Sequence, residues 1–261
     1  MTTATVPRRA WVEQVMGLPV SIHVRGDDPD SPGVRRGVEA AFAGLRHADA
    51  VFSPYRDDSD LTRWERGDLA AGAADPTFAE VLALCDEARE RTGGWFDPRG
   101  LPDPRTGAPR FDPSGLVKGW AVERAAGPLR RLQRYSWCIN AGGDVLVHAE
   151  DHHPAWRVGI EDPTHPALLL HVLERRDGAV ATSGTAHRGG HILDPYTRRP
   201  AGAVRSVTVT GPDLLWADVY ATAAAARGPR GLHWLDTLDG YAALLVSASG
   251  LRQVTTAWPT A

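Results

Sequence analysis

The sequence predicts an α+β fold in which strands and helices alternate irregularly. The segments lack the regular strand–helix–strand spacing of a doubly wound parallel sheet, which favours mixed or antiparallel sheets. The chain of 261 residues is long enough for one large domain or two small ones with a sizeable core. Because no internal repeat and no low-complexity linker divides it, we predict a single domain over residues 1–261.

Composition narrows the possible partners and location. A net charge of -3 gives no broad basic surface, so nucleic acid is not expected as a partner. No apolar run approaches the length of about 20 residues that a membrane span requires, so we expect no membrane insertion. Cys85 and Cys138 lie in apolar runs, as reduced core cysteines of a cytosolic protein do. The polar start, Met1–Arg9, is followed by no apolar signal core, so we expect a cytoplasmic location.

The first third of the chain predicts one strand and three helices. Apolar and polar residues alternate over 20–24, which indicates a strand with one solvated face. A turn rich in Asp, Pro and Gly leads to a helix over 34–51, where apolar residues recur at helical spacing. A short helix is expected from Ser59. The next helix begins at Asp75-Pro76 and ends at Gly93-Gly94.

The middle of the chain predicts a loop, a helix and a pair of strands. The Gly- and Pro-rich stretch 95–110 is expected to be a long loop, and such loops are often functional. A helix capped by Asp112 or Ser114 follows and reaches about Leu132. Residues 135–147 then indicate two strands around 140–144. Gly142 and Gly143 there suit a hairpin turn or the approach of a flat ligand to bare backbone.

The last third adds strands, one long Ala-rich helix and a short one. The expected strands are 156–160, 168–173, 179–181, 205–210, 241–246 and 253–256, and the expected helices are 213–226 and 232–238.

The segment 111–122 is the one around which the candidate chemistry gathers. Gly115 and Gly119 allow another backbone or a ligand to approach closely. Lys118 lies in the first turn of the predicted helix, where free N–H groups and the helix dipole favour an anion such as phosphate. A capped amphipathic helix with one exposed lysine explains the same residues without a ligand.

Asp218 and Thr222 lie four residues apart, so they share one face of the Ala-rich helix. A carboxylate and a hydroxyl suit a hard cation such as Mg²⁺, which takes oxygen ligands. In the alternative interpretation, Asp218 interacts with the helix dipole and Thr222 is packed inside.

Three further places contain candidate functional residues. His191 precedes Asp194-Pro195 and suits a general base, although a lone histidine is more often structural. Asp97 follows Phe96, and Ser53 lies near Tyr55; these residues suit binding of a heteroaromatic ring or ordinary loop capping. The sequence contains no P-loop, no dinucleotide-binding glycine fingerprint and no Gly-x-Ser-x-Gly elbow.

Eight motifs follow one another along nearly the whole chain: Met16-Gly17; Ser53-x-Tyr55 with Ser59-x-x-x-Arg63; Thr92-Gly93-Gly94-Trp95-Phe96-Asp97-Pro98; Asp112-x-Ser114-Gly115-x-x-Lys118-Gly119-x-Ala121-Val122; Asn140-x-Gly142-Gly143; Thr182-Ser183-Gly184; His191-Ile192-x-Asp194-Pro195; and Ala217-Asp218-x-x-Ala221-Thr222. Taken in this order, they resemble the ApbE family of flavin transferases, the FAD:protein FMN transferases. Each motif alone is weak, but eight in register are specific.

The resemblance implies an ApbE-like, T-fold-like domain with an FAD cleft between subdomains. It implies that FAD is split at its pyrophosphate with Mg²⁺ present, that FMN passes to a Thr or Ser hydroxyl of a target flavoprotein, and that AMP leaves. The implied metal ligands are Asp218, Thr222 and the Gly115 carbonyl, and the implied base is His191. The implied FAD-binding residues are Met16, Ser53, Tyr55, Asp97, Lys118, Gly142, Gly143, Ser183 and Ile192. This hypothesis requires Lys118 and Asp218 to share one site.

The chain also departs from the family pattern. The loop after Phe96-Asp97-Pro98 and the segment 183–191 are short, Glu65 stands where an Asn is often found, and Arg198 stands where the family has Gly. Two other functions therefore stay open. One is a Mg²⁺-dependent FAD pyrophosphatase with water as the attacking group, and the other is a non-catalytic FAD-binding protein. The lack of an export signal implies a cytoplasmic acceptor; neither the acceptor nor the oligomeric state follows from the sequence.

Overall fold

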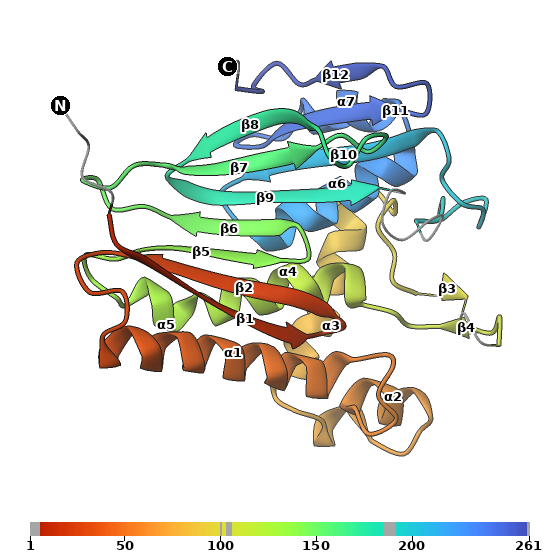
Figure 1. Cartoon of the computed structure of the whole chain (residues 1–261). Coiled ribbons are helices and arrows are strands. Elements are labelled where there is room, and N and C mark those ends of the chain that lie inside the picture. The colour runs from red at the N-terminus through yellow and green to blue at the C-terminus, as the bar shows by residue number, and fades with distance from the viewer. Residues whose placement is uncertain (1–5, 100, 103–105, 185–191, 260–261) are drawn as a thin grey trace.

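An eight-stranded antiparallel sheet forms the centre of the computed structural model, which describes residues 6–99, 101–102, 106–184 and 192–259 (Figure 1). Its strand order is β1 (Arg8–Val15), β2 (Leu18–Arg25), β5 (Ser136–Ala141), β6 (Asp144–His148), β9 (Asp177–Gly184), β10 (Val204–Gly211), β11 (Ala242–Ser247) and β12 (Arg252–Val254). Every neighbouring pair is antiparallel. The α+β class with antiparallel sheets is thus confirmed.

Two small sheets and seven α-helices complete the described part of the chain. The small sheets are β3 (Leu101–Pro102) with β4 (Pro109–Arg110), and β7 (Trp156–Glu161) with β8 (Leu169–Arg175). The helices are α1 (Pro32–Phe52), α2 (Asp60–Glu65), α3 (Thr77–Arg91), α4 (Ser114–Ala125), α5 (Gly127–Arg130), α6 (Leu214–Arg227) and α7 (Arg230–Leu235), with one 3₁₀ turn at Ala71–Ala73.

The large sheet has a hydrophobic core on each face. Side chains alternate along a strand, so Leu146 and Leu245 face the helices while Val145 and Leu244 face the opposite side. The core on the helix side contains α1, α3, α4 and α6 residues and is the larger of the two. The core on the other side lies under the β7–β8 hairpin, whose Trp156, Val158 and Ile160 are buried.

Helices α4 and α6 pack at unusually short range. Gly119 of α4 is buried, and a Cβ atom placed on it would lie 2.9 Å from the Leu214 carbonyl oxygen and 2.9 Å from the Leu215 Cα. Both atoms belong to the α6 backbone, which cannot rotate away as a side chain does. Glycine is therefore required here for the two helices to meet.

Several expected elements differ in the structure. The strand β1 was not expected, because it is an edge strand and only its last residue, Val15, is buried, so it has no apolar face to detect. The expected 95–110 loop contains the short strands β3 and β4. The helix expected to reach Leu132 is broken after Ala125, and α5 begins with Gly127-Pro128. The short helix expected over 232–238 is α7, which begins and ends earlier.

Candidate functional site

Several segments with predicted site residues lie toward the same end of the large sheet, on the right in Figure 1. The β1–β2 turn, the β5–β6 turn, the end of β9 and the first turn of α4 all lie toward this end. Strands β2 and β5 are neighbours with Val20 opposite Ala141, so the turns at Met16-Gly17 and Gly142-Gly143 are adjacent. The Gly142 amide donates to the Pro19 carbonyl oxygen at 3.2 Å.

The Gly142-Gly143 pair forms a hairpin turn, one of the two alternatives predicted for it. Its φ angles are 61° and 101°, in the region that glycine adopts readily, and the Asn140 side-chain oxygen accepts the Gly143 amide at 2.9 Å. Met16 also has a positive φ, 54°, in the neighbouring turn. That either turn contacts FAD stays a prediction.

Lys118 lies between two buried carboxylates. Its Nζ forms an ion pair with Asp144 Oδ2 and lies 3.4 Å from Asp218 Oδ2. The side chains of Asp144 and Asp218 are 2% and 3% exposed, and that of Lys118 is 20% exposed. The structure thus brings Lys118 and Asp218 together, as the sequence-based hypothesis required. In such a poorly solvated place, charge interactions are stronger than at the surface.

Asp144 is a site residue that the sequence analysis missed. It is the first residue of β6, directly after the Gly142-Gly143 turn, and its Oδ1 accepts the Thr182 amide of β9 at 3.0 Å. A buried carboxylate in a strand needs charged or hydrogen-bonding partners. An aspartate that begins a strand with apolar residues on both faces was therefore a signal, although the sequence could not say that Lys118 was the partner.

Ser183 and Thr222 form a second contact at the same end of the sheet. Ser183 Oγ and Thr222 Oγ1 lie 2.8 Å apart, which joins the end of β9 to α6. Thr222 lies one helical turn after Asp218, so the carboxylate and the hydroxyl share a face of α6 as predicted. The helix α6 begins at an Asp213 cap, which accepts the Trp216 amide at 2.8 Å.

The available donor atoms suit a hard cation rather than a transition metal. Asp218 and Thr222 supply carboxylate and hydroxyl oxygens, the ligand types that Mg²⁺ takes. Within the described ranges there is no group of three or more His, Cys, Asp and Glu side chains placed to hold a metal ion. A cation at this site would therefore also use carbonyl, water or substrate oxygens, as Mg²⁺ commonly does. The first turn of α4 at Gly115 packs close to the Phe96 ring, and a role of the Gly115 carbonyl stays a prediction.

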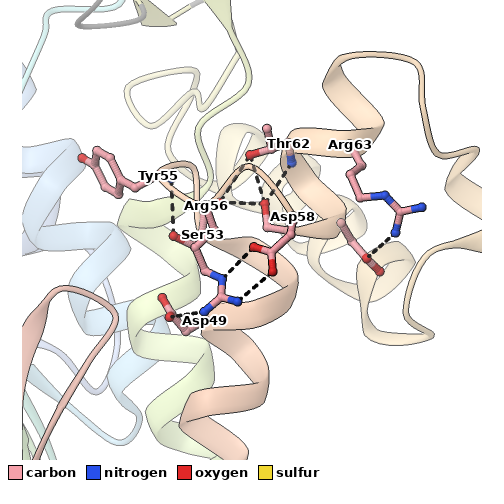
Figure 2. A network of polar contacts seen from close by, with 9 residues as sticks. Asp49, Ser53, Tyr55, Arg56, Asp58, Thr62 and Arg63 are labelled. Atoms are coloured by element: carbon pink, nitrogen blue, oxygen red, sulfur yellow. Dashed lines mark hydrogen bonds and ion pairs between the residues drawn. The ribbon is translucent and has the colours of Figure 1, made fainter.

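Ser53 and Tyr55 lie in a network of polar contacts between α1 and α2 (Figure 2). Ser53 caps the end of α1, and its Oγ accepts the Tyr55 amide at 3.4 Å. Arg56 forms ion pairs with Asp58 at 3.0 Å and Asp49 at 3.9 Å. The contacts of Ser53 are those of loop capping.

The Tyr55 ring is the part of this network that is open to a ligand. The residue is 82% exposed, and Figure 2 shows its ring pointing away from the ion pairs of Arg56. An exposed aromatic ring on an ordered loop can stack on a flat heteroaromatic group. Binding of a flavin or adenine ring by Tyr55 stays a prediction.

Asp97 lies in the loop that follows α3, and Ile192 lies in the segment before Asp194. The Asp97 carboxylate accepts from Arg89 Nε at 2.9 Å and from the Arg99 amide at 3.0 Å. Ile192 is buried, and its carbonyl oxygen accepts the Ala201 amide at 2.9 Å. His191, the predicted base, lies outside the described residues.

A tyrosine next to these residues joins two of the motifs. The Tyr196 hydroxyl donates to the Gly93 carbonyl oxygen at 2.8 Å, and its ring meets Trp95 edge-to-face with centroids 4.9 Å apart. The segment that follows His191 is thereby attached to the loop that contains Asp97.

Two departures from the family pattern have clear local structures. Glu65 Oε1 accepts the Phe111 amide at 2.6 Å, so Glu65 ties α2 to the segment just before α4. Arg198 has a φ of 58°, a left-handed conformation that fits the Gly expected at this position. Asp194 stabilises the same turn, because its Oδ1 accepts the amides of Tyr196 and Thr197 at 2.8 and 3.1 Å.

The cleft expected between subdomains stays a prediction. Two surface depressions of the described residues lie elsewhere. One is between β1 and α1 beside Trp11 and Phe42, and the other is beside Trp120 and Trp216. None of the helices in the described ranges combines the length and the apolar composition that crossing a membrane requires.

Comparison with known proteins agrees with the site motifs. The family model described as "ApbE family" matches residues 16–102 and 103–245, which is most of the chain. This chain belongs to the ApbE family. A structure titled as the ApbE protein of Thermotoga maritima has the same fold, with a TM-score of 0.82 over 96% of this chain and 97% of that chain at 22% identity.

Two relatives share higher identity with this chain over a shorter stretch. The Rhodobacter capsulatus protein named FAD:protein FMN transferase is 34% identical over 129 residues, which is 46% of this chain and 25% of that protein. The Vibrio cholerae protein of the same name is 33% identical over 129 residues, which is 45% of this chain and 38% of that protein. The match thus spans well under half the length of either relative.

Proposed function

We propose that this chain is a transferase that moves FMN from FAD to a Thr or Ser hydroxyl of a target flavoprotein and releases AMP. Membership of the ApbE family and the names of two relatives support the reaction. The observation that carries the proposal is the position of Lys118 between Asp144 and Asp218, next to the Ser183–Thr222 contact. Phosphoryl transfer depends mainly on positioning and charge neutralisation, which this arrangement offers.

Lys118 would bind the pyrophosphate of FAD. Its side chain is 20% exposed, whereas those of its two carboxylate partners are 2% and 3% exposed, so Lys118 is the most accessible charge of the three. Charge-assisted hydrogen bonds to phosphate oxygens are stronger than neutral ones. The proposed flavin and adenosine contacts are Met16, Ser53, Tyr55, Asp97, Gly142, Gly143, Ser183 and Ile192.

Asp218 and Thr222 would hold Mg²⁺, with the Gly115 carbonyl as a third ligand. When bound, the ion supplies neutralisation of the charge that develops on the pyrophosphate oxygens. Helix α6 places the two ligands one helical turn apart on the same face, and Ser183 orients the Thr222 hydroxyl.

His191 would act on the acceptor hydroxyl, whose own pKa is too high for attack without a base. The acceptor oxygen forms a bond to the FMN phosphorus, the bond from that phosphorus to the AMP oxygen breaks, and His191 takes the hydroxyl proton. The described part of the chain ends at Gly184 and resumes at Ile192 on either side of this segment. The acceptor is proposed to be a cytoplasmic protein.

The test uses the purified chain with FAD, Mg²⁺ and candidate cytoplasmic flavoproteins. Mass spectrometry of the acceptor should show an added FMN, and AMP should form in equal amount. Thr222→Val should abolish transfer because it removes a cation ligand, whereas Thr210→Val is the matched control. Thr210 is a buried threonine whose hydroxyl donates to the Ala179 carbonyl oxygen within the sheet, whereas Thr222 is partly buried.

Three other outcomes would contradict the proposal. Rapid AMP release without an acceptor, and no modified protein, would assign an FAD pyrophosphatase. Bound FAD with neither product would assign an FAD-binding protein. Undiminished transfer in EDTA would remove the cation from the mechanism.

A further inference from the structure

We propose that Asp144 is a positioning residue that draws the Lys118 ammonium toward the sheet and so weakens its competition with a divalent cation for Asp218. The inference rests on the proposed cation site at Asp218 and Thr222. It assigns a task to Asp144, which neither the spacing of the motifs nor the resemblance identified.

Asp144 is itself held firmly in place. The tight Gly142-Gly143 turn, closed by the Asn140 side chain at 2.9 Å, sets the start of β6. The ladder between β6 and β9 reaches only to Val145 opposite Val180. Beyond that pair, the Asp144 carboxylate replaces the missing backbone acceptor and binds the Thr182 amide at 3.0 Å.

Lys118 is placed between two competing carboxylates. Its Nζ contacts Asp144 Oδ2 more closely than Asp218 Oδ2, from which it is 3.4 Å away. The distance from Lys118 Nζ to Asp218 Oδ2 is within ion-pair range, so the ammonium and a bound cation would compete for the same Asp218 carboxylate. Two positive charges this close in a poorly solvated site repel each other strongly.

The charge of Asp144 therefore decides which carboxylate Lys118 prefers. With its charge in place, Asp144 attracts Lys118 toward the sheet, and the ammonium competes less with a cation for Asp218. If Asp144 loses its charge, Asp218 becomes the more attractive carboxylate for Lys118, and the ammonium competes with the cation.

The decisive variant is Asp144→Asn, which removes the charge and keeps a side-chain oxygen for the Thr182 amide. The double variant Asp144→Asn/Lys118→Met also removes the competing ammonium. Asp162→Asn is the matched control. Asp162, the first residue of the loop between β7 and β8, is buried; its Oδ1 accepts the Thr164 amide at 2.8 Å, and its Oδ2 pairs with Arg252 at 3.2 Å.

The experiment titrates the full chain with Mn²⁺ alone. The electron paramagnetic resonance signal of free Mn²⁺ reports how much of the ion is bound. Loss of one charge-assisted contact is enough to change an affinity by about tenfold. We expect Asp144→Asn to raise the Mn²⁺ Kd by about tenfold or more, the double variant to restore it, and Asp162→Asn to leave it unchanged.

An unchanged Kd in Asp144→Asn would overturn the inference, as would a raised Kd that the double variant does not restore, because that pattern indicates a merely structural role. Lys118→Met provides the same test if Asp144→Asn does not fold: it should bind Mn²⁺ more tightly than the unmodified chain, and an equal or higher Kd contradicts the competition.

Asp218→Ala separates the two proposals. If it binds Mn²⁺ as well as the unmodified chain, the cation site itself is wrong and the inference falls with it.

Discussion

Replacing Gly119 by Ala should push α4 and α6 apart and thereby separate Lys118 from Asp218. The added Cβ would lie 2.9 Å from both the Leu214 carbonyl oxygen and the Leu215 Cα. Because these are backbone atoms, the strain can be relieved only by a shift of one helix against the other. Lys118 is the preceding residue of α4, so any shift acts directly on its ion pair with Asp218.

Two opposing effects set the expected change in stability. Alanine in the interior of a helix is favoured over glycine by about 1 kcal/mol. Overpacking of a dense core costs about 1–3 kcal/mol, and contact with backbone on two atoms places Gly119 at the upper end of that range. The expected loss in the free energy of unfolding is therefore about 2 kcal/mol.

Urea denaturation of Gly119→Ala and a control, Gly44→Ala, tests this reasoning. Gly44 also lies in the interior of a helix, α1, but a Cβ there would meet only the Ala125 Cα at 4.0 Å. Gly44→Ala should raise the free energy of unfolding by up to about 1 kcal/mol. The reasoning is refuted if Gly119→Ala is as stable as the unmodified chain, or if it is destabilised but binds Mn²⁺ and FAD with unchanged affinity.

Three further predictions concern single residues. Arg198→Gly should raise the free energy of unfolding in urea by about 0.5–1 kcal/mol, because the φ of 58° strains an arginine and suits glycine; a loss of stability would show that the arginine side chain matters more. Hydrogen bonds from the Thr197 amide and then the Tyr196 amide lower the pKa of Asp194. The stabilisation by Asp194 should thus be complete above its ordinary pKa of about 4 and lost as the pH falls through the lowered value, so the difference in Tm between the unmodified chain and Asp194→Ala should shrink in acid. Burial raises the pKa of the Cys85 thiol to about 12, so a disulfide reagent at neutral pH should modify Cys85 only after denaturation.

The sequence predicted those elements whose burial pattern repeats regularly. The strand β2 alternates buried residues with less buried ones as far as Val24, and α6 combines an Asp213 cap with a run of alanines, so both were expected near their observed bounds. Edge strand β1 was missed because its partner β2, and not an apolar face of its own, determines its conformation.

The candidate site was predictable only in part for a similar reason. The helical period placed Asp218 and Thr222 on one face, but the closeness of Lys118 to Asp218 was implied by the family resemblance and not by spacing. The pairing of Asp144 with Lys118 and the close approach at Gly119 depend on how the helices pack against the sheet and against one another. Such packing is a property of the tertiary structure, and no local pattern of residues contains it.

The two hydrophobic cores lie on opposite faces of the sheet, and the candidate cation site lies on the face of only one of them. Lys118 and Asp218 belong to helices on one side, whereas the β7–β8 hairpin and Trp156 cover the other. An insertion or fused peptide at the exposed part of the hairpin loop, residues 164–168, would then affect only the smaller core. That loop is consequently the natural place to attach a label or a tether while the opposite face keeps its geometry.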